Sequence, residues 1–126
     1  MMRTAYQSPQ GTAIGPYSHA VDGGTVVYLS GQTPVDPATG KLVDGGIGSQ
    51  TQQCFANLFA VLAAAGLTGN DVVKVNVYLT DMNNFAAMNA VYAEQFAKPY
   101  PARTTIGVSS LPLGASVEIE MIARKK

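Results

Sequence analysis

The sequence predicts an α+β domain in which two helices cover one face of a mixed sheet. Residues 71–79 and 117–121 alternate apolar and polar side chains, which is typical of strands. Residues 47–65 carry apolar side chains at helical spacing, and a second helical stripe follows Asp81. A chain of 126 residues can bury one core but is short for two, so we expect a single domain over residues 1–126.

The N-terminal third is predicted to form strands and turns. Residues 3–7 suit a short first strand. Residues 18–21 and 25–31 are rich in β-branched and aromatic side chains and are separated by Asp22-Gly23-Gly24, so they predict a hairpin. Proline and glycine within residues 36–40 predict a further turn before the first helix.

Both helices carry apolar stripes and end signals. The first stripe consists of Cys54, Leu58, Val61, Leu62 and Ala65, and Gly66 follows it where a left-handed C-terminal cap is expected. Asp81 or Asn83 can cap the second helix, which ends before Pro99. Its core-facing residues are Phe85, Met88, Tyr92 and Phe96. Because crossovers between parallel strands are right-handed, both helices are expected on one side, which leaves the other sheet face bare.

The candidate chemistry lies in residues 101–121, which read as two strands joined by a turn. With these strands paired antiparallel or placed close together, Arg103, Thr105, Glu118 and Glu120 are expected on the bare sheet face, with Arg103 and Glu118 facing one pocket. An arginine fork binds carboxylates, and a glutamate can take a proton from water, so the pair suits hydrolysis of a small carboxylated substrate. An ordinary cross-strand salt bridge explains the same pair equally well.

Composition limits the partners of this chain. Eight basic and eight acidic residues balance, so bulk charge draws it neither to nucleic acid nor to an anionic membrane. Only 13% of the residues are charged whereas 47% are hydrophobic, which indicates a surface covered in a homo-oligomer. No stretch has the length of a signal peptide or a membrane span, so a cytoplasmic protein is expected. His19 and Cys54, each the sole residue of its type, are predicted to be structural and not metal ligands.

Several motifs resemble those of one family. Pro101-Ala102-Arg103 followed by Val117-Glu118-Ile119-Glu120-Met121 resembles the signature of the Rid (YjgF) family of reactive-imine deaminases. Gly15-Pro16-Tyr17 and Leu29-Ser30-Gly31-Gln32 are similar to further motifs of that family. The resemblance covers nearly the whole chain. It implies a chorismate-mutase-like fold that assembles as a homotrimer with sites in clefts between subunits.

The resemblance also implies roles for individual residues. Arg103 is expected to bind the substrate carboxylate, and Glu118 to orient or activate the attacking water. The other matching pocket positions are Tyr17, Ser30, Gly31 and Asn89. Some relatives have cysteine where this chain has Thr105, so thiol regulation does not transfer, although the Thr105 backbone N–H can contact a carboxylate. One subunit is expected to supply Arg103 and Glu118, and the next Tyr17, Ser30 and Gly31.

The implied substrates are 2-iminopropanoate and 2-iminobutanoate, which pyridoxal-phosphate-dependent dehydratases release from serine and threonine. The products are 2-keto acids and ammonia, and no cofactor is required. Two other classes of function remain open. One is a non-catalytic small-carboxylate-sensing or chaperone-like module that uses the same cleft. The other is a ribonuclease or translation inhibitor, as some family members have been described, but the chain lacks a basic stripe, an RNA-stacking motif and a histidine pair.

Overall fold

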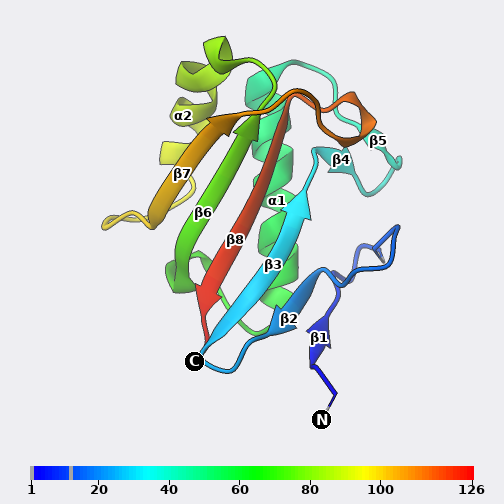
Figure 1. Cartoon of the computed structure of the whole chain (residues 1–126), viewed down its shortest axis with the longest axis vertical. Coiled ribbons are helices and arrows are strands. Elements are labelled where there is room, and N and C mark those ends of the chain that lie inside the picture. Colours follow the sequence, from blue (N-terminus) through cyan, green and yellow to red (C-terminus); the bar gives the residue numbers. More distant parts are fainter. Residues whose placement is uncertain (1, 12) are drawn as a thin grey trace.

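A computed structural model describes residues 2–11 and 13–126 and shows two helices packed on one face of a six-stranded sheet (Figure 1). The strand order is β1-β2-β3-β8-β6-β7. The strands are β1 (Ala5–Tyr6), β2 (Ala20–Asp22), β3 (Val26–Gln32), β6 (Val72–Leu79), β7 (Ala102–Gly107) and β8 (Val117–Arg124). The helices are α1 (Ile47–Ala64) and α2 (Phe85–Ala93). The predicted α+β architecture is confirmed.

The sheet is mixed because one of its strand pairs is parallel. β7 runs parallel to β6, whereas β1–β2, β2–β3, β3–β8 and β6–β8 pair antiparallel. The predicted hairpin is confirmed as β2 and β3. A second, two-stranded hairpin of β4 (Val35–Asp36) and β5 (Lys41–Leu42) was not predicted. It forms around the expected turn, where Asp36 Oδ1 accepts a hydrogen bond from the Ala38 N–H at 2.9 Å.

The core lies between the sheet and the two helices. Its largest fully buried side chains include Phe55, Leu58, Leu62, Leu79, Met88, Ile119 and Met121. The first helix ends as predicted, since Gly66 has a φ of 75°. The second helix ends at Ala93, earlier than its apolar stripe suggests. Phe96 nevertheless packs against the core beyond the end of this helix, with its ring centroid 5.7 Å from that of Phe55.

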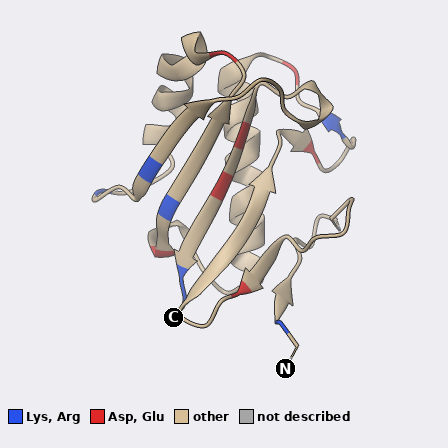
Figure 2. Ribbon diagram, in the orientation of Figure 1, with Lys and Arg blue, Asp and Glu red and all other residues tan. Residues whose placement is uncertain are grey.

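The other sheet face carries no helix and exposes several large side chains, among them Tyr28 (53% exposed) and Ile106 (46% exposed). Figure 2 shows acidic positions in β8 and basic positions in β6 and β7, with little charge elsewhere on the sheet. We call the sheet face that carries no helix the open face. No helix within residues 2–11 and 13–126 is long and apolar enough to cross a membrane.

The prediction that the last two strands place four polar residues on one face is wrong in part. β7 and β8 do not pair, because β6 lies between them. The parallel register sets Arg103 beside the buried Val75, so Arg103 and Thr105 point to the helix side. Glu118 and Glu120 lie on the open face, as expected. The physical reason is that α2 is the crossover from β6 to β7, which makes β7 the parallel edge strand beneath that helix.

Candidate active site in two halves

The Arg103 guanidinium is held by α2. Its Nη1 donates a hydrogen bond to Asn89 Oδ1 at 2.6 Å. Its Cζ lies 4.5 Å from the ring centroid of Tyr92 and 5.5 Å from that of Phe85, so two aromatic rings support the cation. Asn89 therefore positions the arginine directly, in addition to any contact it makes with a ligand.

No acidic group neutralises Arg103 in the part of the chain that the structure describes. The salt bridges there join Lys125 to Asp22 and Lys126 to Asp71. The alternative of a salt bridge between Arg103 and Glu118 within one chain is therefore contradicted. Thr105 lies two residues along the strand on the same side as Arg103, and its Oγ1 is buried without a partner among the described atoms. A fixed, unneutralised guanidinium is a binding group for an anion.

Glu118 occupies the open face opposite Tyr78 of β6 and beside Gly31 of β3. A Cβ atom built on Gly31 would overlap Glu118 Oε2, so the carboxylate rests in the gap left by the missing side chain. Burial, and then the charge of Glu120, raise the pKa of Glu118. A carboxylate with a raised pKa is a better proton acceptor for a water molecule.

Glu120 differs from Glu118 because its carboxylate is bonded within the chain. The Tyr78 hydroxyl donates to Glu120 Oε1, and Asn76 Nδ2 donates to the same oxygen at 3.4 Å. The bond to Glu120 is the main factor that raises the pKa of Tyr78 to about 12. Among the described residues, Glu120 Oε1 thus has two hydrogen-bond donors, whereas neither carboxylate oxygen of Glu118 has one, which leaves Glu118 the more available to a ligand. This agrees with its predicted role, which stays a prediction.

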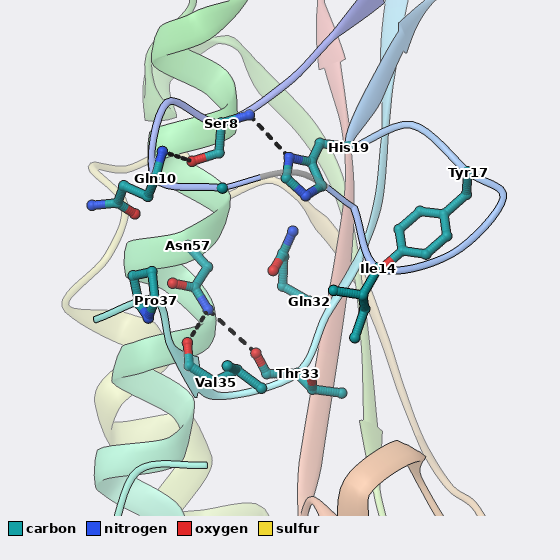
Figure 3. A pocket seen from close by; sticks show the side chains of 11 residues that line it. Ser8, Gln10, Ile14, Tyr17, His19, Gln32, Thr33, Val35, Pro37 and Asn57 are labelled. Carbon is teal, nitrogen blue, oxygen red and sulfur yellow. Dashed lines mark hydrogen bonds between the residues drawn. The ribbon is translucent and has the colours of Figure 1, made fainter. Parts of the chain in front are cut away.

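Tyr17 and Ser30 lie apart from Arg103. The Ser30 hydroxyl donates to the Ser18 carbonyl at 2.6 Å, so it ties β3 to the segment before β2. Tyr17 borders a pocket of about 230 Å³ that is also lined by His19 and Gln32 (Figure 3). His19 Nδ1 accepts a hydrogen bond from the Ser8 N–H at 2.9 Å, and burial lowers the pKa of this imidazole. This pocket includes neither Arg103 nor Glu118.

One copy of the chain therefore holds two separate halves of the predicted site. Arg103, Asn89 and Thr105 form a cationic half on the helix side of β7, whereas Glu118 and Gly31 form an acidic half on the open face. The expected grouping of Arg103 with Glu118 in one subunit is wrong, because a sheet separates their side chains. Within one chain, Gly31 lies against Glu118, so these two residues belong to the same half.

Asn76 and Tyr78 of the acidic half were missed in the sequence. Their alternation with buried valines places them on the open face, but it does not give their register against β8. Among the described residues, no group of three or more His, Cys, Asp or Glu could hold a metal ion. Cys54 is buried and donates from Sγ to the Gln32 carbonyl at 3.2 Å, and burial raises the pKa of its thiol. These features suit a core residue and not a nucleophile.

Comparison with known proteins identifies the family. The family model described as Endoribonuclease L-PSP matches residues 7–125. The RutC family protein PH0854 of Pyrococcus horikoshii is 52% identical over 113 residues, which cover 90% of each chain. The crystal structure of RidA from the Antarctic bacterium Psychrobacter sp. PAMC 21119 superposes with a TM-score of 0.91 at 45% identity, over 97% of this chain and 99% of that one. This chain belongs to the Rid (YjgF) family.

Members of the Rid family carry different functional names. A Dermatophagoides farinae relative, 50% identical over 109 residues, is named 2-iminobutanoate/2-iminopropanoate deaminase, and the match covers 86% of this chain and 85% of that protein. The family model, in contrast, is described as an endoribonuclease. Family membership therefore supports an imine-deaminase function in general terms, and the substrate and the reaction must be inferred from the site.

Proposed function

We propose that this protein is a hydrolytic deaminase of small 2-imino acids such as 2-iminopropanoate and 2-iminobutanoate. The observation that carries the proposal is the Arg103 guanidinium, which Asn89 and Tyr92 hold in place while no carboxylate of the described chain neutralises it. A 2-imino acid has a carboxylate next to the C=N carbon. Two-point binding of that carboxylate by Arg103 would therefore also orient the reacting carbon.

The active site in this proposal lies between copies of the chain in a homotrimer. Arg103, Asn89 and Thr105 of one copy would face Glu118 and Gly31 of its neighbour. The exposed aromatic and aliphatic side chains of the open face and the low content of charged residues support such an assembly. We also propose that Tyr17 and Ser30 line the wall of this cleft.

The reaction follows from the proposed positions. Glu118 takes a proton from water while the water oxygen attacks the imine carbon, which gives a tetrahedral carbinolamine. The carbinolamine collapses to a 2-keto acid as the C–N bond breaks, and protons from the water leave with nitrogen as ammonia. One imine and one water thus give one keto acid and one ammonia, without a cofactor. Pyridoxal-phosphate-dependent dehydratases acting on serine or threonine would supply these substrates.

The decisive test measures pyruvate formation when a serine dehydratase releases 2-iminopropanoate in the presence of the protein. Because the imine also hydrolyses spontaneously, the expected result is a rate above that of the dehydratase alone. Arg103→Ala should abolish the increase and leave the fold intact. Arg3→Ala is the matched control, since Arg3 lies exposed near the N-terminus. An increase that survives in Arg103→Ala would refute the role of the arginine.

A non-catalytic carboxylate sensor is the second candidate, because the same held guanidinium would bind carboxylates without turnover. Calorimetric titration with a stable carboxylate such as pyruvate separates the two. Binding that depends on Arg103, together with no acceleration of imine hydrolysis, would favour the sensor and refute the deaminase.

A further inference from the structure

The open face holds a cluster of four polar side chains in a defined register. Tyr78 lies directly opposite Glu118 across the β6–β8 pair, and Asn76 lies opposite Glu120. The hydroxyl of Tyr78 donates diagonally to Glu120, and Asn76 donates to the same oxygen. All four side chains are half-buried, so their interactions are screened less than those of fully exposed groups. The Glu120 carboxylate is therefore fixed next to Glu118 on the same strand.

Few titratable groups other than Glu120 face Glu118 from the elements packed against it. β6 contributes Tyr78, while Lys74 of that strand lies opposite Ile122 and donates to Thr104 at 2.9 Å. β3 contributes Gly31 and Ser30 at this level, neither of which titrates in the working range. From the far side of the sheet, α1 contributes the buried, protonated Cys54 thiol. Burial and Glu120 thus set the electrostatic surroundings of Glu118 within the chain.

We propose that Glu120, held by Tyr78 and Asn76, is a positioning residue whose fixed negative charge promotes transfer of a proton from water to Glu118. This inference rests on the proposed deaminase function and extends it to residues outside the reacting pair. It assigns distinct tasks to the two motif glutamates: Glu118 receives the proton, and Glu120 keeps a charge beside it without touching the substrate.

The change of charge during the proton transfer explains why a fixed negative charge on Glu120 promotes it. In this step a water O–H bond breaks and an O–H bond forms on the Glu118 carboxylate, so two neighbouring negative charges become one. Relief of that repulsion favours the transfer. Tyr78 keeps its own proton throughout, because the hydrogen bond to Glu120 raises the pKa of Tyr78 to about 12. Tyr78 therefore fixes Glu120 in place and does not act as the proton donor.

The test compares Glu120→Gln with Tyr78→Phe in the assembled protein. Glutamine keeps the oxygen that Tyr78 and Asn76 bond and removes only the charge. The kcat/KM of imine hydrolysis is measured against pH, and the titration of Glu118 is followed by the carboxyl carbon-13 shift in glutamate-labelled protein. Glu118→Gln assigns that signal.

The charge of Glu120 raises the pKa of Glu118, so its removal should lower that pKa. The acidic limb of the rate profile should then move to lower pH in Glu120→Gln. The plateau rate should fall by no more than about tenfold for each unit that the limb moves, with KM unchanged. Tyr78→Phe keeps the charge, so its acidic limb should stay closer to that of the wild type. A purely structural role predicts equal losses in both variants and an unmoved limb, which would overturn the proposal.

The two readouts also separate this inference from the proposed function. If the wild type does not accelerate imine hydrolysis, but the Glu118 signal titrates at lower pH in Glu120→Gln, the deaminase fails while the electrostatic coupling stands. If the wild type is active, but neither the rate profile nor the signal moves in Glu120→Gln, the coupling is refuted and the deaminase stands.

Discussion

Replacing Gly31 by alanine tests the acidic half of the site by adding a single methyl group. The new Cβ would overlap Glu118 Oε2 and would lie 3.1 Å from Glu118 Cδ, so the carboxylate must swing out of its gap. The Glu118 carboxylate is the end of a flexible side chain on the open face, so it can move aside. Gly31 does not have a positive φ, so alanine fits its backbone conformation. The substitution should therefore change the free energy of unfolding by less than about 1 kcal/mol, because alanine also reduces the entropy of the unfolded chain.

The catalytic cost of Gly31→Ala should be far larger. A displacement of about 1 Å in a catalytic group lowers a rate by about 100-fold, so we expect a loss of at least that size in kcat/KM for imine hydrolysis. The assay follows pyruvate formation from dehydratase-released 2-iminopropanoate, and thermal unfolding of the same sample reports stability. Gly48→Ala is the matched control, because its Cβ would meet only Val91 Cγ2, at 3.9 Å. A folded Gly31→Ala variant with the wild-type rate would show that the position of Glu118 does not matter.

Four further predictions concern the two halves of the site and His19. Arg103→Lys should lose nearly as much activity as Arg103→Ala, since lysine keeps the charge but not the two-point fork; an active lysine variant would contradict this. Glu118→Gln should still bind pyruvate in calorimetry, while its hydrolysis rate falls by about 100-fold or more. Refolding Arg103→Ala together with Glu118→Gln should restore activity at about a quarter of the sites in a random mixture, because each site then draws its residues from two copies. No recovery despite proven subunit mixing would refute the shared site. Burial lowers the pKa of His19 below 6.5, so the unfolded chain binds the proton more readily and the melting temperature should fall as pH drops through that value. His19→Asn should flatten this pH dependence; an unchanged slope would exclude His19 as its cause.

The sequence predicted most elements of the fold because their periodicities are strong. Residues 72–79 and 117–124 alternate clearly, and the helix ending before Gly66 carries a continuous apolar stripe. For β7, the prediction of which side chains face the helices was wrong. Arg103 was expected on the bare sheet face, yet Ile106 of the same strand is 46% exposed on that face and Arg103 packs on α2. Alternation in an edge strand gives two faces but does not say which one is buried when neither is uniformly apolar.

The sequence proposed a set of candidate site residues but could not give their arrangement. The resemblance to the family motifs indicated Arg103 and Glu118, whereas strand order and register are set by tertiary pairing that the local pattern does not contain. The hydrogen-bond partners of Glu120 could not be predicted for the same reason. Tyr78 bonds Glu120 diagonally across the sheet, and that contact requires the register of β6 against β8. Asn89 was expected to contact substrate, and the structure adds its bond to Arg103.

The separation of Arg103 from Glu118 by the sheet has a chemical consequence for the proposed reaction. If both side chains shared one face of one copy, they would pair directly. The guanidinium charge would then lower the pKa of Glu118, and the Glu118 oxygens would occupy the donors that a substrate carboxylate needs. Within one chain, where the two lie on opposite faces, Arg103 keeps its donors, and burial and Glu120 raise the pKa of Glu118. In a cleft between copies, the substrate would lie between the two groups, its carboxylate on the arginine and its imine carbon toward the glutamate. Assembly would therefore bring the two groups close enough for catalysis without a direct salt bridge, which would occupy the donors of Arg103 and lower the pKa of Glu118.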